Sequence, residues 1–335
     1  MTQDAIVHEG GMSRRVAVIG GGAWGSALAS ALAQNGHDVR ILTRRDDLAT
    51  ALEHGTSPAL DGLAITAPSR ASTDPAVVLD AVDAVVMVVP VSATASSLAQ
   101  LRPYLPEGAP VAFAAKGLEP QDNTLICDYA AGAITNPVVM LSGPSFADEV
   151  AMGKPAGLVS ASRHDHAARL IAGLFTGSNI RVYTSDDPSG VAVGGAVKNV
   201  IAIASGITAG LKLGDNARAA LLTRGLAEAA RLALALGGRQ ETLFGLAGLG
   251  DMTLTCSGPH SRNFAYGLAL GEGRVPDGKL AEGRHSCAVI ARRAALAGVE
   301  MPITEAVARV VAGDGDIMEE ITQLMARPAD SEWAN

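Results

Sequence analysis

The chain has 335 residues, of which 48% are hydrophobic and 3% aromatic, and its formal net charge is −8 at pH 7. This length fits about two domains, and the composition is that of a globular protein with a core of small aliphatic side chains. The negative charge and the lack of a basic run exclude nucleic acid and anionic membranes as expected partners.

Other features of the composition concern location. Cys127, Cys256 and Cys287 are scattered and lack the spacing of a metal site. We therefore expect reduced thiols in the cytoplasm and no bound metal. No apolar run approaches the roughly 18–20 residues of a membrane span, which predicts no stable membrane insertion. Residues 1–13 are mostly polar and lack the apolar segment of a secretion signal, so we expect a flexible tail.

From residue 14 to residue 187, short apolar segments alternate with helical patterns. Helices are expected near 24–35, 91–102 and 163–175, and strands at 15–20, 37–43, 63–68, 84–90, 110–117, 137–145, 156–162 and 180–185. Such alternation predicts a parallel sheet with helices on both faces, and near-continuous apolar strands fit burial on both sides. We therefore predict a doubly wound, Rossmann-type α/β domain.

The pattern changes after Asp187, where strand signals end. Ala- and Leu-rich helical patterns follow, most clearly at 216–238, 286–299 and 304–313. Residues 188–330 are therefore expected to form a mostly helical second domain that carries the substrate and catalytic residues. The abrupt change suggests a cleft between the two domains.

A glycine-rich turn joins the first predicted strand to the first predicted helix. GGGAWG at 20–25 contains Gly20-x-Gly22-x-x-Gly25. In this fingerprint the first glycine permits a tight turn, the second lets a pyrophosphate approach the backbone, and the third lets helix and strand pack closely. The helix N-terminus then offers free N–H groups to the phosphates. The strand–turn–helix context favours dinucleotide binding over a purely structural turn.

The end of the second predicted strand bears on cofactor choice. An acid in this region would hold the ribose 2′-hydroxyl of NAD(H). The strand ends instead in Thr43-Arg44-Arg45, and two guanidinium groups suit a 2′-phosphate. The pattern favours NADP(H), with NAD(H) still possible, and the alternative is that both arginines are solvated surface residues.

One lysine interrupts an apolar helical segment, GGAVKNVIAIASG at 194–206. Lys198 either extends its ammonium to water along a buried stem or is held among apolar side chains for chemistry. Gly194 and Gly195 lie on the same helical face and are expected to leave room for a small ligand. Apolar surroundings lower the pKa of a lysine, which suits proton transfer near neutral pH. We therefore predict that Lys198 is an acid–base group.

Polar side chains gather in residues 244–267. A glycine-rich, flexible lead-in is expected to present Asp251, and Thr255 follows it. A hydroxyl, a guanidinium and an amide then stand in three consecutive positions, Ser261, Arg262 and Asn263. Such donors together suit a phosphate. The alternative is an ordinary polar turn that caps the next helix.

Two loops at predicted strand ends add further donors. Lys116 follows the apolar run PVAFAA, and Gly143 and Ser145 follow PVVML. In open parallel sheets ligands bind outside the carboxyl ends of the strands, so these residues are candidate substrate contacts. Lys116 could as easily be a surface lysine, and Ser145 a helix N-cap.

These motifs, in their order and spacing from about residue 15 to 290, resemble those of the bacterial NAD(P)-dependent sn-glycerol-3-phosphate dehydrogenases. The matching segments are GGGAWGSALA, AAKGLEP, LSGPSFADEV, GGAVKNVIAIASG, NARAALLTRGLAE, FGLAGLGDMTLTC and SRN. The resemblance implies a Rossmann-type domain followed by a helical domain of the 6-phosphogluconate dehydrogenase C-terminal type. It also implies reversible reduction of dihydroxyacetone phosphate by NAD(P)H to sn-glycerol 3-phosphate, which feeds phospholipid synthesis.

The resemblance also implies catalytic roles. Lys198 falls on the family's proton acceptor, and Asp251 on the aspartate of its GLGD motif. We expect Asp251 to orient the amine, with Asn199 or Thr255 completing the hydrogen bonds. One departure is Ala115, where many members have Ser or Thr before the lysine, and this puts the hydrogen bonding around Lys116 in question.

Ligand contacts follow in the same way. Arg262 and Asn263 fall on the phosphate-binding pair, beside Ser261, and substrate contacts are implied for Lys116, Gly143 and Ser145. Cofactor contacts are implied for Ala23, Trp24, Arg44, Ala147, Arg262, Leu280 and Glu282. To these we add, as cofactor contacts expected from their positions, Gly20, Gly22, Gly25, Arg45 and Lys116.

Two rival functions fit parts of the pattern. A β-hydroxyacid dehydrogenase shares the two-domain plan and a Lys-Asn pair on a helix, but it binds a carboxylate, whereas the SRN segment favours a phosphate. A non-catalytic dinucleotide sensor would keep the glycine-rich turn without needing Lys198 and Asp251. We expect a phosphorylated small molecule as substrate and a homodimer as the default assembly.

Overall fold

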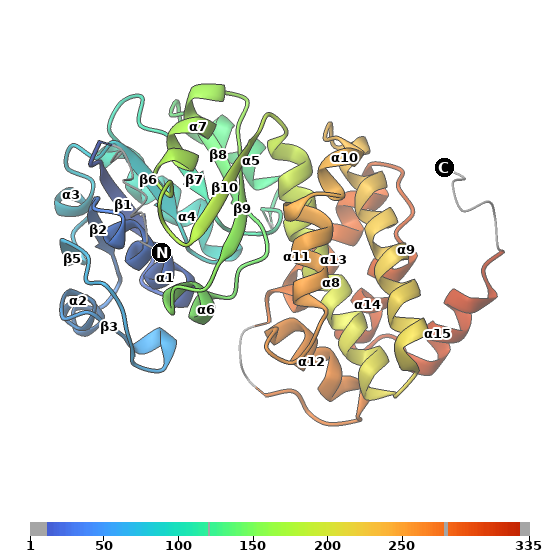
Figure 1. The fold of residues 1–335 in the computed structure, drawn as a ribbon. Coiled ribbons are helices and arrows are strands. Elements are labelled where there is room, and N and C mark those ends of the chain that lie inside the picture. Colours follow the sequence, from blue (N-terminus) through green and yellow to red (C-terminus); the bar gives the residue numbers. More distant parts are fainter. Residues whose placement is uncertain (1–11, 120, 278–280, 329–335) are drawn as a thin grey trace, which may run out of the picture.

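Figure 1 shows the computed structural model, which describes residues 12–119, 121–277 and 281–328. An α/β domain is followed along the chain by a domain of helices, which confirms the predicted fold class. Most of the tail expected at 1–13, the predicted cofactor contact Leu280, and residues 329 and 330 of the predicted second domain lie outside the described residues.

Within the described residues, the first domain is built on an eight-stranded sheet with the order β10-β9-β8-β7-β6-β1-β2-β5. A separate pair, β3 and β4, is antiparallel. The strands are β1 Arg15–Ile19, β2 Asp38–Leu42, β3 Thr56–Ser57, β4 Leu63–Ala64, β5 Arg70–Ser72, β6 Ala84–Met87, β7 Val111–Phe113, β8 Val138–Ser142, β9 Ala156–Ala161 and β10 Ile180–Ser185.

Helices lie on both sides of this sheet (Figure 1). They are α1 Ala23–Gln34, α2 Asp46–Glu53, α3 Pro75–Val78, α4 Val91–Leu101, α5 Ile126–Ala133, α6 Ala147–Ala151 and α7 Asp165–Gly173, with the 3₁₀ turns η1 Pro58–Leu60 and η2 Arg102–Tyr104.

Alternate residues of the central strand β1 enter opposite cores. Val16 and Val18 belong to one apolar cluster, whereas Ala17 and Ile19 belong to another that continues through Val197 into the helical domain. The two covered faces explain why this strand is apolar at successive positions. The second cluster also joins the two domains through a continuous core.

The strand predicted at 63–68 is wrong. Only Leu63–Ala64 is extended there, as β4, and the edge of the main sheet is formed by β5 instead. Pro68 carries no N–H and cannot donate to a ladder. The chain before it bonds elsewhere, because the Thr66 N–H donates to Ser30 Oγ at 3.0 Å. Pairing with β2 therefore begins only after the proline.

The expectation of a wholly parallel sheet is also wrong at one place, because β8 and β9 are antiparallel. The connecting helix α6 has five residues. At 1.5 Å per residue it spans about 7.5 Å, less than the roughly 16 Å of a five-residue strand. The connection, residues 143–155, thus lacks the long helix of a usual parallel crossover, and β9 runs in the opposite direction to β8.

The second domain is helical throughout its described residues. Its helices are α8 Pro188–Gly210, α9 Gly214–Ala235, α10 Gln240–Leu243, α11 Asp251–Thr255, α12 Arg262–Gly271, α13 Glu282–Leu296, α14 Pro302–Ala312 and α15 Ile317–Ala326, with a π-helical turn, η3, at Leu246–Gly250.

Helix α8 is the centre of this domain, and α9, α11, α12, α13 and α14 pack around it. It begins at Pro188, and the Asp187 side chain caps it by accepting from the Gly190 N–H at 2.8 Å. Helix α12 crosses it closely, since a Cβ added at Gly267 would lie 2.0 Å from Ile203 O. This crossing places α12 directly against the helix that carries Lys198.

The expectation that no segment is apolar enough to span a membrane is wrong for α8. By length and hydropathy it could do so, but its most apolar stretch is completely buried within the protein. It is therefore the core helix of the second domain, and no other helix among the described residues has this character.

Candidate active site

The glycine-rich turn has a geometry suited to a dinucleotide. Gly20 has φ +115°, and a Cβ at Gly25 would lie 1.9 Å from Gly20 O, so neither position admits a side chain. Gly22 instead has open space, with nothing within 4 Å of a Cβ. It is the N-cap of α1 and makes no side-chain cap, so the first N–H groups of the helix are free for an anion. Ala23 and Trp24 are the first two residues of α1.

The two arginines after β2 differ in their contacts, although both are exposed. Arg45 pairs with Asp47, and its Nε donates to Asp47 Oδ1 at 2.9 Å. Arg44 makes no hydrogen bond or ion pair with the described residues. Its guanidinium is therefore the one available to a ligand.

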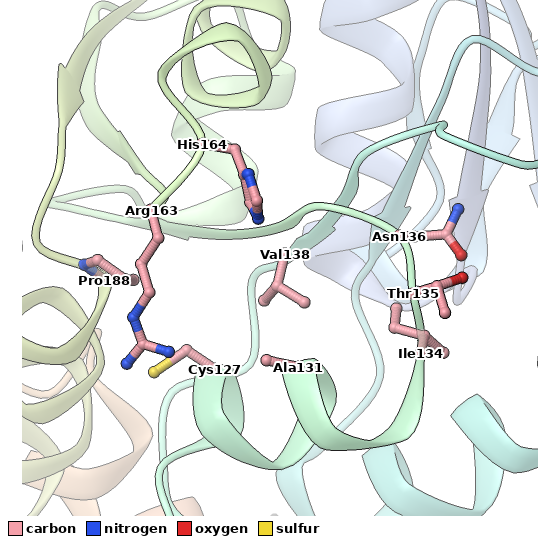
Figure 2. Close-up of a pocket in the computed structure, with 9 residues that line it drawn as sticks. All are labelled: Cys127, Ala131, Ile134, Thr135, Asn136, Val138, Arg163, His164 and Pro188. Atoms are coloured by element: carbon pink, nitrogen blue, oxygen red, sulfur yellow. The ribbon is translucent and has the colours of Figure 1, made fainter.

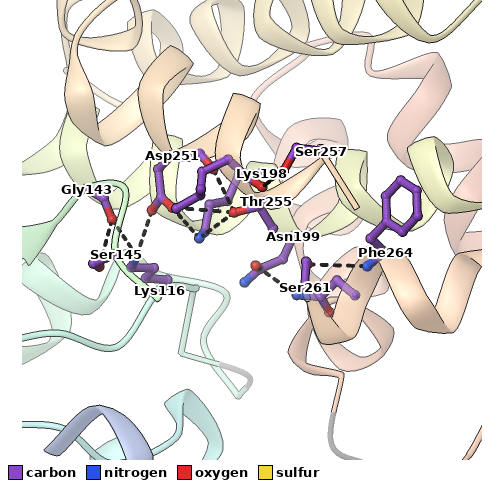
Figure 3. Close-up of polar contacts among 12 residues, drawn as sticks. Lys116, Gly143, Ser145, Lys198, Asn199, Asp251, Thr255, Ser257, Ser261 and Phe264 are labelled. Atoms are coloured by element: carbon purple, nitrogen blue, oxygen red, sulfur yellow. Dashed lines mark hydrogen bonds and ion pairs between the residues drawn. The ribbon is translucent and has the colours of Figure 1, made fainter. Parts of the chain in front are cut away.

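Lys198 lies in the middle of α8 and is 7% exposed. Its ammonium donates to Asp251 Oδ1 at 2.6 Å and to Thr255 Oγ1 at 2.9 Å, as Figure 3 shows. Both acceptors lie on the short helix α11. Because the ammonium is held inside the protein, the alternative of a lysine that reaches out to water is wrong. Of the two residues expected to complete its hydrogen bonds, Thr255 takes that position.

Asp251 bridges two lysines that come from different domains. Its Oδ2 accepts from Lys116 Nζ at 2.6 Å, and Lys116 also donates to Gly143 O at 3.3 Å (Figure 3). The Lys116 side chain is 14% exposed, so it is not a surface lysine. Neither contact involves Ala115, so the departure from the family pattern leaves the hydrogen bonds of this lysine intact.

The charged groups of this cluster shift one another's pKa values. The pKa of Lys198 is lowered to about 8: burial is the largest cause, the Asp251 carboxylate opposes it, and the nearby ammonium of Lys116 adds to the lowering. Burial alone would raise the pKa of Asp251, but the two ammonium groups bring it below its ordinary value. Asp251 is therefore a carboxylate, while Lys198 can gain or lose a proton near neutral pH.

The space expected beside Lys198 for a ligand is filled by protein. A Cβ at Gly194 would lie 2.7 Å from Ala247 O, and one at Gly195 would lie 3.2 Å from Lys116 Cγ. The glycines thus admit the η3 backbone and the Lys116 side chain, which corrects that expectation. The lead-in to Asp251 is likewise a packed turn and not a flexible loop, because a Cβ at Gly248 would lie 2.1 Å from Leu243 O.

The three residues predicted to bind phosphate lie at the start of α12, in different environments. The Ser261 hydroxyl caps the helix by accepting from the Phe264 N–H at 3.3 Å, as the alternative interpretation anticipated. Arg262 is exposed and makes no hydrogen bond or ion pair with the described residues.

The Asn263 side-chain amide makes two hydrogen bonds within the helical domain. Its Nδ2 donates to Asn199 Oδ1 at 2.9 Å, and its Oδ1 accepts from the Gly283 N–H at 2.9 Å. Asn199 therefore contacts Asn263 and not the Lys198 amine. The same bond fixes the start of α13, where the predicted cofactor contact Glu282 is the first residue.

The loop after β8 lies beside the lysine cluster. Gly143 has φ +149°, and its carbonyl accepts from Lys116 and, at 3.0 Å, from Ser145 Oγ. Ser145 is not an N-cap, because Phe146 holds that position for α6. Ala147 is the first residue of α6.

A cavity of about 330 Å³ lies elsewhere, beside the start of α8 (Figure 2). Its lining includes Arg163 and Asn136 but none of the predicted site residues. The Arg163 guanidinium is paired with Asp128 at 2.7 Å, and the Asn136 amide donates to Pro106 O and Ala109 O. Since none of the predicted site residues lines it, the cavity takes no part in the site described above.

Comparisons with known proteins agree with the motifs. Residues 15–168 match the N-terminal family of NAD-dependent glycerol-3-phosphate dehydrogenases, and residues 187–322 match the C-terminal family. A protein of Mesorhizobium japonicum named glycerol-3-phosphate dehydrogenase (NAD(P)+) is 44% identical over 330 residues, which cover 98% of this chain and 96% of that protein. The chain belongs to the glycerol-3-phosphate dehydrogenase family.

Solved structures extend the comparison. The glycerol-3-phosphate dehydrogenase of Coxiella burnetii superposes with a TM-score of 0.87 at 36% identity, covering 94% of this chain and 99% of that one. A ketopantoate reductase from Ralstonia eutropha JMP134 shares the fold alone, with a TM-score of 0.61 at 21% identity, covering 92% of this chain and 99% of that one. The two-domain plan thus occurs in other reductases, and family membership decides against the β-hydroxyacid dehydrogenase and sensor alternatives.

Proposed function

We propose that Lys198 is the acid–base group with which this glycerol-3-phosphate dehydrogenase reduces dihydroxyacetone phosphate to sn-glycerol 3-phosphate. The observation that carries the proposal is the buried Lys116–Asp251–Lys198 cluster between the two domains, in which the pKa of Lys198 is lowered to about 8. A proton donor works best when its pKa lies near the working pH.

The residues divide the work of proton transfer. In reduction, the Lys198 ammonium donates a proton to the oxygen that develops charge at C2, and in oxidation the neutral amine takes the proton from the C2 hydroxyl. Asp251 and Thr255 hold Nζ in one orientation throughout, since both accept from it. With two ammonium groups and one carboxylate the cluster carries one net positive charge, which stabilises an oxyanion in a site shielded from water.

Binding of the substrate phosphate is assigned to Arg262, with Lys116 as a second cation. Arg262 supports this role because it is exposed at the start of α12 and makes no bond with the described residues. Asn263 and Ser261 shape the same helix start through their bonds within the domain. Binding energy from this non-reacting group would hold C2 in place for the reaction.

The first domain fits the nicotinamide cofactor, because the open position at Gly22 and the uncapped start of α1 suit its pyrophosphate. When bound, this cofactor supplies or accepts the hydride at C2. Leu280, Glu282 and Ala147 remain further proposed contacts of this cofactor.

Preference for NADP(H) over NAD(H) is proposed to depend on Arg44, the arginine without a partner among the described residues. Arg44→Ala should raise KM for NADPH by about tenfold, from the loss of a charge-assisted hydrogen bond, and leave KM for NADH nearly unchanged. Arg45→Ala is the matched control, because Arg45 is already paired with Asp47. Equal KM values for NADPH and NADH in the unmodified enzyme would refute the preference.

The activity itself is tested by following NADPH absorbance with dihydroxyacetone phosphate and, in parallel, with 3-hydroxy and semialdehyde acids. Turnover with the phosphorylated ketone and its absence with the acids is expected. Turnover of the acids alone would overturn the assignment of the substrate.

A homodimer in the cytoplasm is also proposed. The location is supported by the three cysteines, which are free and buried. Large apolar side chains on the helical domain, such as Leu234 and Leu296, are exposed and would be covered in a dimer. Sedimentation equilibrium tests the assembly, and a single species at the mass of one chain would contradict it.

A further inference from the structure

His260 joins the two domains just before the proposed phosphate-binding residues. Its ring stacks on Phe146 with centroids 3.9 Å apart and planes inclined by 26°. Its Nε2 lies 3.0 Å from Asp148 Oδ1. Phe146 and Asp148 belong to the start of α6 in the first domain, whereas His260 lies between α11 and α12 in the second. One side chain therefore makes two different contacts across the domain boundary.

Both sides of this contact adjoin proposed ligand-binding residues. On the first domain, Phe146 follows Ser145 and precedes Ala147. On the second domain, His260 directly precedes Ser261 and Arg262. A change in the contact would therefore move the loop after β8 relative to the start of α12.

Hydrogen bonds within the helical domain also fix the start of α12. Ser261 caps the helix, and Asn263 bonds to Asn199 on α8 and to Gly283 on α13. These bonds hold the residues around Arg262 in shape, but they do not set their distance from the first domain. The contacts of His260 add a direct link from this segment to α6, beside the shared core and the Lys116–Asp251 pair that join the domains elsewhere.

We propose that His260 is a positioning residue for the phosphorylated substrate. It holds the segment 261–263 against α6, so that the phosphate site is assembled before the substrate arrives. A site ordered in advance does not have to spend binding energy on ordering its loops. This inference rests on the assignment of Arg262 to the substrate phosphate.

Removing the side chain is the first test. His260→Ala should raise KM for dihydroxyacetone phosphate by about fivefold to tenfold, since an exposed hydrogen bond and a stacked aromatic contact are both lost. Both kcat and KM for NADPH should stay within about twofold, because Lys198 and the glycine-rich turn are untouched. The split between KM and kcat separates positioning from a general loss of structure.

Two further substitutions separate the contacts of His260. His260→Phe keeps the stacking and loses the hydrogen bond, whereas His260→Gln keeps a hydrogen-bond donor and loses the ring. Each should give a KM between those of the unmodified enzyme and His260→Ala.

The partner carboxylate has a matched control on the same helical turn. Asp148→Asn should raise KM for dihydroxyacetone phosphate, but Glu149→Gln should not, because Glu149 pairs with Lys154 and not with His260. The double variant His260→Ala/Asp148→Asn should be no worse than His260→Ala alone.

Amide hydrogen exchange gives a readout that does not depend on turnover. Exchange in residues 257–264 should be faster in His260→Ala than in the unmodified enzyme or in Glu149→Gln. Unchanged exchange together with an unchanged KM for the ketone would overturn the proposal, and so would a rise only in KM for NADPH. Absence of turnover by the unmodified enzyme would instead refute the proposed function, and the exchange comparison would still decide the role of His260.

Discussion

Asp251 and Glu228 are both carboxylates of the helical domain and both 1% exposed, yet they are held in opposite ways. Glu228, on α9, accepts hydrogen bonds at the start of α14 from three neutral donors, the Ile303 N–H, the Thr304 N–H and the Thr304 hydroxyl. Burial, only partly opposed by these bonds, raises the pKa of Glu228 to about 7. Asp251 faces two ammonium groups instead, and its pKa is lowered.

The difference shows that burial raises the pKa of a carboxyl group, and that nearby cations are needed to keep a buried carboxyl group charged. Neutral donors do not offset the burial of Glu228, so its pKa stays raised, and the group serves as a cap that joins α9 to α14. Two lysines keep Asp251 ionised, and the ionised carboxylate in turn orients Lys198. A fixed charge in the core therefore marks the reacting site, whereas a buried carboxyl by itself does not.

The largest expected effect comes from removing the amine. Lys198→Met should lower kcat for ketone reduction by about 10² to 10⁴, the usual contribution of general acid–base catalysis, while KM for NADPH changes little. Lys212→Met, at an exposed position two residues beyond the end of that helix, is the matched control and should retain full activity. A Lys198→Met enzyme within tenfold of the unmodified one would mean that another group transfers the proton.

The second effect comes from removing the fixed negative charge. Asp251→Asn leaves Lys198 without its counter-ion, so the pKa of the amine should fall below about 8. Reduction at pH 7 should slow by about 100-fold, because less of the amine is protonated and its orientation is lost. Steady-state kinetics from pH 6 to pH 9 would show the break in rate at lower pH. A break at the same pH as in the unmodified enzyme would contradict the role given to Asp251.

Removing the Lys116 ammonium should shift the pKa of Lys198 in the opposite direction, upward. The Lys116 ammonium lowers the pKa of Lys198, so Lys116→Met should raise it and extend ketone reduction to higher pH. KM for dihydroxyacetone phosphate should also rise by about tenfold, as a charge-assisted contact is lost. If the pKa of Lys198 shifted in the same direction in Lys116→Met and Asp251→Asn, the roles given to the two partners would be wrong.

The smallest effect on activity is expected at Glu228, where the comparison predicts a change in stability alone. Its folded-state pKa of about 7 lies above the usual value of 4.5. Its stabilising contribution is therefore fully present below pH 4.5 and is lost as the pH rises through about 7. In Glu228→Gln this dependence should disappear, so the difference in unfolding free energy between the two proteins should shrink by on the order of 1–3 kcal/mol from pH 5 to pH 8.

Urea denaturation at several pH values measures this difference, and kcat should stay within twofold. A loss of activity comparable to that of Asp251→Asn would mean that the two carboxylates are not distinguished as described.

The features that could be predicted from the sequence mostly involve residues that are close together in the chain. The glycine-rich turn is specified within six residues, and the apolar residues and glycines around Lys198 favour an acid–base role over a lysine that reaches water. The role of Gly25 in close packing was likewise visible from its place between strand and helix. Such features depend on neighbours along the chain, so periodicity and spacing are sufficient to find them.

The features that could not be predicted depend on contacts between residues far apart in the chain, which sequence spacing does not indicate. Lys116 and Asp251 are 135 residues apart, and no pattern in either segment indicates that they pair. The space at Gly195 is taken by Lys116 for the same reason. The direction of β9 depends on the short length of α6, and the role of His260 on the stacking partner Phe146, 114 positions earlier in the chain.

The pH dependence of kcat/KM for dihydroxyacetone phosphate tests the central claim, that Lys198 donates the proton, most directly. With saturating NADPH, the account predicts a constant value near pH 7 and a fall of about tenfold per pH unit above about 8, as the ammonium is lost. Oxidation of sn-glycerol 3-phosphate should show the opposite limb, rising toward a plateau above the same pH. Rates in the two directions that change in the same sense, or that show no break between pH 7 and pH 9, would contradict it.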